Sequence, residues 1–173
     1  SLDAIIRAYQ KSGKALHVGF NRRFSPHSQK MKSLLPSGQA IHIIATMNAG
    51  FIPANSWVHD LQVGGGRIIG EACHFIDLAT YFTGSKVKSV MMNALGTQPS
   101  ENTDNASLLL QYENGSNVVI NYFSNGSKQY SKERLEFYFQ EKTIVMDNFR
   151  TTEAFGIKGF SKLKTKQDKG HAA

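Results

Sequence analysis

Residues 64–84 read GGGRIIGEACHFIDLATYFTG, and this stretch predicts the helix around which the rest of the chain is organised. A triple glycine opens it, and Gly84 stands where helices commonly end on a residue with left-handed backbone angles. The apolar residues in between recur with the helical period of about 3.6 residues. They predict one buried face: Ile68, Ile69, Ala72, Phe75, Ile76, Ala79 and Phe82. We expect this face to lie on the core.

The opposite face of this helix is typical of a cleft: it carries Arg67, Gly70, Glu71, His74, Asp77 and Tyr81. Glu71 and Asp77 stand three residues before and after His74, a spacing at which helical side chains meet. A carboxylate there could orient the imidazole, which could then pass a proton to or from a substrate hydroxyl. The alternative is a surface histidine that pairs with acids for modest stability. The residues leave both interpretations open.

Composition favours a single globular domain with a sizeable core, since the 173 residues are 40% hydrophobic and 19% charged. The sequence shows no apolar run of membrane-spanning length and no signal peptide. Cys73 is the only cysteine, which excludes an internal disulfide and favours a reducing, cytoplasmic setting. No metal site is expected, because His59, Glu71, His74 and Asp77 match no metal-ligand spacing.

The formal net charge of +7 raises the possibility of nucleic-acid binding. Much of the excess is a run of alternating lysines near the C-terminus: Lys158, Lys162, Lys164, Lys166 and Lys169. Lysines on an edge strand commonly prevent sheet-to-sheet aggregation, and no nucleic-acid-binding motif accompanies these. We therefore expect no nucleic-acid partner and no membrane partner.

Outside the central helix, the pattern predicts helices early in the chain and strands later. Helices are expected at Leu2–Gln10 and from Pro26 through Leu35, with a strand at Lys14–Phe20 between them. Further strands are expected at Ala40–Met47, Lys86–Leu95, Ala106–Tyr112, Val118–Phe123, Glu133–Phe139 and Thr143–Asp147, with weaker candidates at Thr152–Phe155 and Ser161–Lys166. The predicted class is α+β, an open mixed, mostly antiparallel sheet with helices on one face.

The uncovered face of that sheet is a candidate oligomer surface, because a broad apolar face is rarely left bare. We expect it to carry some of Tyr122, Phe137, Phe139 and Val145.

Other candidate site residues lie in the loops. Arg22 and Arg23 could clamp a phosphate or carboxylate, or form an ordinary basic turn. Trp57 and Asp60 precede the triple glycine and could line a cleft, although a lone tryptophan is as often a packing residue. The triple glycine lacks the GxGxxG spacing, so it is not expected to be a dinucleotide phosphate loop.

Several segments together resemble the C-terminal domain of the glucose-fructose oxidoreductase / inositol dehydrogenase / MocA (GFO/IDH/MocA) family. They are GFNRRFSP, a loop with Trp and Asp, GGGRIIGEACHFIDL, and DNASLLLQYENGS followed by a long strand. The resemblance implies that residues 1–24 are the last helix and strand of a preceding Rossmann domain. Residues 25–173 would be the substrate and oligomerisation domain, truncated at its C-terminus.

The resemblance also implies an activity. His74 matches a family histidine that transfers a proton to or from a sugar or polyol hydroxyl, while Gly70 stands where the family often has an aspartate. The full-length protein would use NAD or NADP, which this fragment would not bind tightly, and it would be inactive alone. The sequence GGGRIIGEACHFIDL resembles that of a subgroup of the family fused to a zinc-type alcohol dehydrogenase region. Arg22 or Arg23 would contact substrate or cofactor phosphate, with Trp57, Asp60, Glu71 and Asp77 lining the cleft.

By the same resemblance, the protein would be a homodimer or homotetramer built through the open sheet face, with a sugar, nucleotide sugar or polyol as substrate. The alternative is a non-catalytic dimerisation or ligand-binding domain in which Gly70 marks lost chemistry.

Overall fold

A computed structural model describes residues 2–171. Within them, eight strands form one sheet in the order β2-β3-β4-β1-β5-β6-β7-β8. The strands are β1 (His42–Asn48), β2 (Val87–Ala94), β3 (Asn105–Tyr112), β4 (Asn117–Phe123), β5 (Glu133–Phe139), β6 (Lys142–Asp147), β7 (Thr151–Phe155) and β8 (Lys162–Lys164). β1 and β4 run parallel, and the other neighbouring pairs are antiparallel. The predicted α+β class with an open, mostly antiparallel sheet is confirmed.

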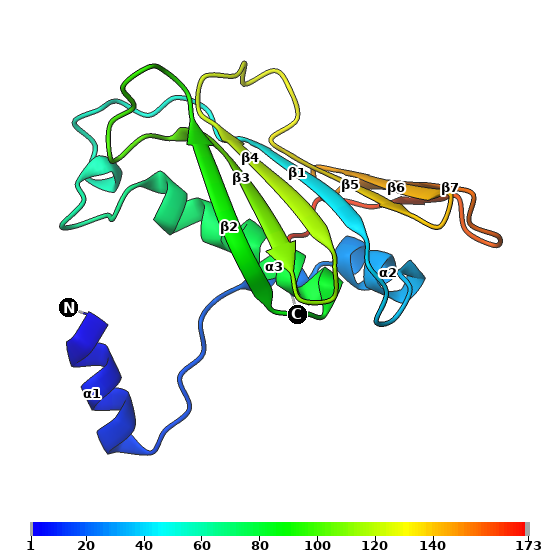
Figure 1. Cartoon of the computed structure of the whole chain (residues 1–173), viewed down its shortest axis with the longest axis horizontal. Coiled ribbons are helices and arrows are strands. Elements are labelled where there is room, and N and C mark those ends of the chain that lie inside the picture. Colours follow the sequence, from blue (N-terminus) through cyan, green and yellow to red (C-terminus); the bar gives the residue numbers. More distant parts are fainter. Residues whose placement is uncertain (1, 172–173) are drawn as a thin grey trace.

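The helices of the described residues are α1 (Leu2–Ser12), α2 (Pro26–Leu34) and α3 (Cys73–Thr83), with short helical segments η1 (Asn21–Phe24), η2 (Trp57–His59) and η3 (Ile68–Ala72). α2 and α3 lie on the same side of the sheet, as expected (Figure 1). None of these helices is both long and apolar enough to cross a membrane.

The central stretch is less regular than its sequence predicts. The glycines precede the helix, η3 is a π-helical turn, and α3 then continues to Gly84, which ends it with a φ of 63°. The wider turn of η3 shifts the positions that follow from the regular helical period. Ile69, predicted to be buried, lies within this turn and is 72% exposed, whereas Phe75 and Phe82 face the core as expected.

The core lies between α3 and the sheet. Phe82 on α3 meets Phe137 on β5 edge to face, with ring centroids 4.8 Å apart. Phe137 also lies opposite Ile43 of β1 and Ile144 of β6, and all three strand residues are buried. These contacts hold α3 against the middle of the sheet.

The uncovered face carries one of the four residues of which some were expected there. Tyr122, Phe137 and Phe139 are buried on the side that the helices cover, whereas Val145 lies on the open side. Successive residues of a strand point to opposite faces of the sheet, so the register of strand pairing decides which residues face the helices. The large apolar side chains exposed on the open face are Ile44, Met91, Leu109, Tyr138 and Phe155.

The N-terminal segment differs from the prediction in one respect. Residues 14–20 form no strand; residues 14–19 are exposed, whereas Phe20 is half-buried. α1 forms near its predicted place, stands away from the sheet (Figure 1), and buries none of its residues. Its apolar residues Leu2, Ile5, Ile6 and Tyr9 are all exposed.

Candidate functional site

A tight loop leads into η3 and α3, and Asp60 holds its shape. The carbonyl of Asp60 accepts hydrogen bonds from the backbone N–H groups of Gly64 (2.8 Å) and Gly65 (2.9 Å). Its carboxylate Oδ1 accepts two more, from the N–H groups of Gln62 (2.7 Å) and Val63 (3.1 Å). Two of the three glycine amides, those of Gly64 and Gly65, are thus already occupied, and Asp60 shapes the loop.

The first glycine is required because the chain passes very close to itself. A Cβ atom on Gly64 would lie 2.5 Å from the carbonyl oxygen of Trp57. Only glycine allows this approach. The Trp57 side chain itself is 67% exposed, so it is free to contact a ligand or another segment.

His74 lies one residue into α3 and is half-buried. The edge of the Phe20 ring meets the imidazole at a centroid distance of 5.6 Å, and Nδ1 is buried without a hydrogen-bond partner among the described residues. Burial lowers the pKa of His74, and Arg22 lowers it further, although Glu133, Asp77 and Glu71 oppose the shift. The imidazole is therefore neutral near neutral pH and able to accept a proton.

The carboxylates beside His74 on the helix do not orient it, contrary to expectation. Glu71 Oε1 accepts a hydrogen bond from Arg67 Nε (3.0 Å), and Oε2 accepts one from the Tyr122 hydroxyl (2.8 Å). Asp77 forms a two-point ion pair with Arg23, whose Nε lies 2.6 Å from Oδ2. Both acids are drawn away from the imidazole because arginines compete for them more strongly.

Arg22 and Arg23 are both engaged with carboxylates. Arg22 binds Glu133 through Nε to Oε2 (3.0 Å) and Nη2 to Oε1 (3.1 Å), and Lys169 Nζ reaches the same Oε1 at 2.5 Å. Arg22 also lies over the Phe75 ring, 5.2 Å from its centroid. The basic turn of η1 is thereby fixed beside α3.

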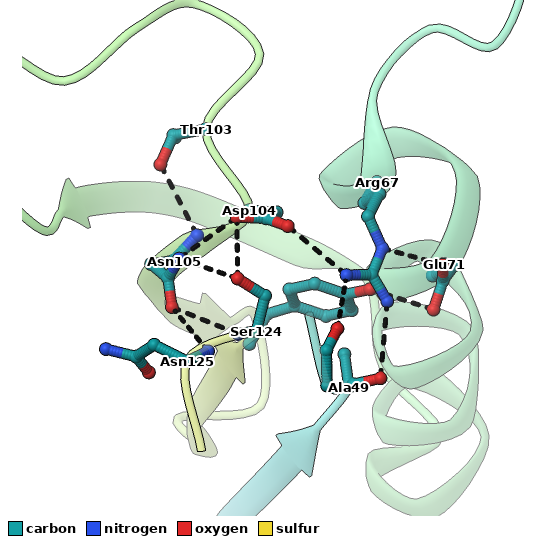
Figure 2. A network of polar contacts seen from close by, with 10 residues as sticks. Ala49, Arg67, Glu71, Thr103, Asp104, Asn105, Ser124 and Asn125 are labelled. Carbon is teal, nitrogen blue, oxygen red and sulfur yellow. Dashed lines mark hydrogen bonds and ion pairs between the residues drawn. The ribbon is translucent and has the colours of Figure 1, made fainter. Parts of the chain in front are cut away.

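Arg67 was not singled out as a site residue from the sequence, yet it organises the start of the helix (Figure 2). Its side chain is 2% exposed and donates to Glu71, to Asp104 Oδ2 (3.2 Å) and to the Gly50 carbonyl (2.8 Å). The guanidinium also lies 5.5 Å from the centroid of the Tyr122 ring. The sequence did contain one sign of this cluster, because Asp104, a partner of Arg67, begins the DNASLLL segment of the family resemblance.

Glu71, His74 and Asp77 lie on η3 and α3, and η1 brings Arg22 and Arg23 beside α3. Among these residues the structure pairs Arg23 with Asp77, whereas Glu71 contacts Arg67 and Tyr122 instead. Trp57 and Asp60 belong to the loop before the triple glycine and share no hydrogen bond with them in the described chain. The described residues hold no group of three or more His, Cys, Asp or Glu side chains placed to bind a metal ion.

The family of the chain is shown by comparison with known proteins. Residues 29–145 match the family model of the GFO/IDH/MocA C-terminal domain. The chain belongs to the GFO/IDH/MocA family. It represents the C-terminal domain of these oxidoreductases, in keeping with the resemblance noted from its sequence motifs.

Two curated relatives in the GFO/IDH/MocA family align with most of the chain. The uncharacterized oxidoreductase YrbE of Bacillus subtilis is 30% identical over 154 residues, which are 85% of this chain and 44% of that protein. Myo-inositol 2-dehydrogenase of Thermotoga maritima is 26% identical over 158 residues, 87% of this chain and 46% of that protein. The chain thus spans less than half the length of either relative.

A solved structure shows the same fold. The UDP-N-acetylglucosamine 3-dehydrogenase GnnA of Acidithiobacillus ferrooxidans superposes with a TM-score of 0.72 at 21% identity, covering 98% of this chain and 54% of that one. At this identity the match establishes the fold of the GFO/IDH/MocA domain.

Proposed function

We propose that this chain forms the substrate side of an NAD(P)-dependent oxidoreductase. The reacting group is a hydroxyl of a sugar, nucleotide sugar or polyol, and His74 takes up or returns its proton. The relatives named for inositol and UDP-N-acetylglucosamine dehydrogenation support this substrate class. The observation that carries the proposal is the state of His74: half-buried, neutral and without an internal hydrogen-bond partner at Nδ1.

The surroundings of His74 suit proton transfer. Its pKa lies below the ordinary histidine value mainly because burial disfavours the charged ring. A base that stays neutral at physiological pH can accept a hydroxyl proton and later return it. Phe20 packs against the ring edge to face and limits its movement.

The other predicted residues support this site in different ways. Arg23 pairs with Asp77 on α3, and Arg22 joins η1 to β5 and lies over the Phe75 ring of α3, so both residues hold the site together. Arg23 is 36% exposed, which leaves its guanidinium accessible to an anionic group of substrate or cofactor. Glu71 anchors the start of the helix through Arg67, and Trp57 offers an exposed ring at the entrance loop.

The nicotinamide cofactor requires a binding loop that residues 2–171 do not form. Asp60 accepts the N–H groups of Gly64 and Gly65, so these two amides are not available to a pyrophosphate. We therefore place the dinucleotide on a preceding domain, to which residues 1–24 belong. The exposed apolar face of α1 and the unpaired segment 14–18 support this assignment, because both resemble elements detached from a packing partner.

Residues 25–173 would then be the substrate and oligomerisation domain. The open face of the sheet supports a homodimer or homotetramer, since Ile44, Leu109 and Tyr138 are exposed on it. Exposed apolar faces of this breadth usually mark a protein interface.

A second candidate is a non-catalytic dimerisation or ligand-binding domain. The observation that favours it is Gly70, one helical turn before His74, which offers no side chain to orient the ring. Loss of an orienting carboxylate would leave the histidine poorly placed for proton transfer.

Turnover of the full-length protein separates the two candidates. His74→Ala is expected to reduce kcat by about 10²–10⁴, the usual contribution of a general base. Cys73→Ala, on the preceding helix position, is the matched control and should retain activity with the same oligomeric state. Unchanged turnover in His74→Ala, or no NAD(P)-linked activity of the native protein on any polyol or sugar, would favour the non-catalytic domain.

A further inference from the structure

A hollow of about 550 Å³ opens among three loops at one end of the sheet. The loops follow β1 at residues 51–54, join β2 to β3 at residues 98–104, and follow β4 at residues 124–125; they gather at the upper end of the sheet in Figure 1. The volume lies within the range of small-molecule sites, about 300–1,000 Å³. His74 and the other predicted site residues do not line this hollow, which shares only Asp104 with the Arg67 cluster described above.

The walls of the hollow are fixed in advance by hydrogen bonds (Figure 2). Asn105 Oδ1 accepts from the backbone N–H groups of Ser124 (3.0 Å) and Asn125 (3.3 Å). Asp104 Oδ1 accepts from the Ser124 hydroxyl (2.7 Å). The second and third loops are thereby held together, which reduces the ordering that a ligand must impose.

The exposed groups around the hollow are uncharged hydrogen-bonding side chains. Gln98, Ser100 and Asn125 are all exposed, and none of their side chains makes a hydrogen bond within residues 2–171. In Figure 2 the Asn125 carboxamide points away from the Asp104 network, so it is free to donate and accept elsewhere. Groups of this kind recognise hydroxyls, each of which donates and accepts a hydrogen bond.

An aromatic ring stands beside these polar groups. Phe51 lines the hollow and is 69% exposed, so one face of its ring is accessible. The C–H face of a cyclic polyol or pyranose ring packs well on such a surface, while its hydroxyls reach the amides around it.

The hollow offers little positive charge to an anionic ligand, since His59 is the one basic side chain in its lining. Its lining residues include no lysine or arginine, and their one carboxylate, Asp104, is paired through Oδ2 with Arg67 Nη1 at 3.2 Å. Arg67 is 2% exposed and already donates to Gly50 and Glu71, so it does not offer its charge to the hollow. A phosphate would find no lysine or arginine there to compensate its charge.

We propose that this hollow binds an uncharged, polyhydroxylated ring, held by packing on Phe51 and by hydrogen bonds from Gln98 and Asn125. The inference goes beyond the proposed function, because it assigns a second binding site on residues remote from His74 in the sequence. The ring is either a part of the substrate distant from the reacting carbon or a separate sugar.

Saturation-transfer NMR on the purified protein tests the proposal with myo-inositol and N-acetylglucosamine as probes. At least one probe should bind, and Phe51→Ala and Gln98→Ala should each weaken that binding about fivefold to tenfold. Tyr130→Ala, which removes an equally exposed aromatic ring outside the hollow, and Gln10→Ala on α1 are the matched controls and should leave binding unchanged.

His74→Ala makes failure of this site distinguishable from failure of the proposed function. Binding that survives His74→Ala but falls in Phe51→Ala supports the hollow. Binding that is lost in His74→Ala and retained in both hollow variants overturns the proposal. The proposal is also overturned if neither probe binds the native protein. In the full-length enzyme, a raised KM in Phe51→Ala identifies the ring as part of the substrate, whereas an unchanged KM with lost probe binding identifies a separate sugar.

Discussion

Arg22 and Glu133 form a two-point ion pair that joins η1 to the start of β5, with Nε–Oε2 and Nη2–Oε1 distances of 3.0 and 3.1 Å. Glu133 is fully buried and Arg22 is 13% exposed, and Lys169 brings the C-terminal segment to the same carboxylate. One buried acid thus connects three distant parts of the chain beside the helix that carries His74.

Removing that carboxylate should strongly destabilise the protein. Glu133→Gln leaves the Arg22 guanidinium largely buried without its counter-charge, which typically costs about 3–5 kcal/mol. Urea unfolding measures the change. Lys162→Gln breaks the exposed Lys162–Glu153 pair and serves as the control, with an expected loss below about 1 kcal/mol. Equal losses in the two variants would show that burial of the Glu133 cluster has little energetic effect.

The same cluster predicts how stability depends on pH. Burial tends to raise the pKa of Glu133, but the hydrogen bonds and charges of Arg22 and Lys169 hold it below the ordinary glutamate value. Because the folded pKa is depressed, this stabilisation is complete above the unfolded pKa and is lost as the pH falls through the folded one. The free energy of unfolding should therefore decrease in acid, and less so in Glu133→Gln. Identical acid dependence in both proteins would contradict the assignment.

The loop before η3 gives a test of local geometry. Gly64→Ala places a Cβ against the Trp57 carbonyl, and overpacking against backbone should cost about 1–3 kcal/mol. Gly70→Ala is the control, because the nearest atom to its Cβ is 3.8 Å away. Alanine there should be neutral or stabilise by up to about 1 kcal/mol. Thermal unfolding of the two variants should shift in these directions, and a stable Gly64→Ala would show that the loop relaxes freely.

Much of the fold follows from short-range pattern in the sequence. The alternating strands from β1 to β7 and the helix ending at Gly84 all lie near their predicted places, because period and turn residues are local signals. The side on which Tyr122 and Phe137 lie could not be predicted, since it depends on pairing between strands far apart in sequence. The exposure of Ile69 follows from the π-turn of η3, which the helical period does not reveal.

The residues of the candidate site could be predicted from the sequence, but the ion-pair partners of those residues could not. The spacing of Glu71, His74 and Asp77 suggested that the acids orient the imidazole. Arg67 and Arg23 instead take those acids, and both pairings depend on how the triple-glycine loop and η1 pack against α3. The Arg67–Glu71 pair has the local i,i+4 spacing, but Arg23–Asp77 and Arg22–Glu133 join residues far apart in the sequence. Long-range ion pairs leave no periodic signal, so Glu133 could be recognised only in the folded chain.

The unpartnered Nδ1 of His74 leads to a prediction about Gly70. Gly70→Asp introduces a carboxylate one helical turn before His74, at a position with room for a side chain. A nearby negative charge favours the protonated ring, so the pKa of His74 should rise from its lowered native value. NMR titration of the imidazole measures this, with Gly70→Asn as the uncharged control. An unchanged pKa in Gly70→Asp would place the new carboxylate out of reach of the ring.

Chemical rescue in the full-length protein tests the central claim most directly. If His74 transfers the hydroxyl proton, the reduced turnover of His74→Ala should increase with the concentration of added imidazole, and the increase should follow the neutral form of imidazole in the oxidation direction. Cys73→Ala should show no response to imidazole. A His74→Ala protein that retains native turnover, or whose turnover is reduced but insensitive to imidazole and other small bases, would contradict the role assigned to His74.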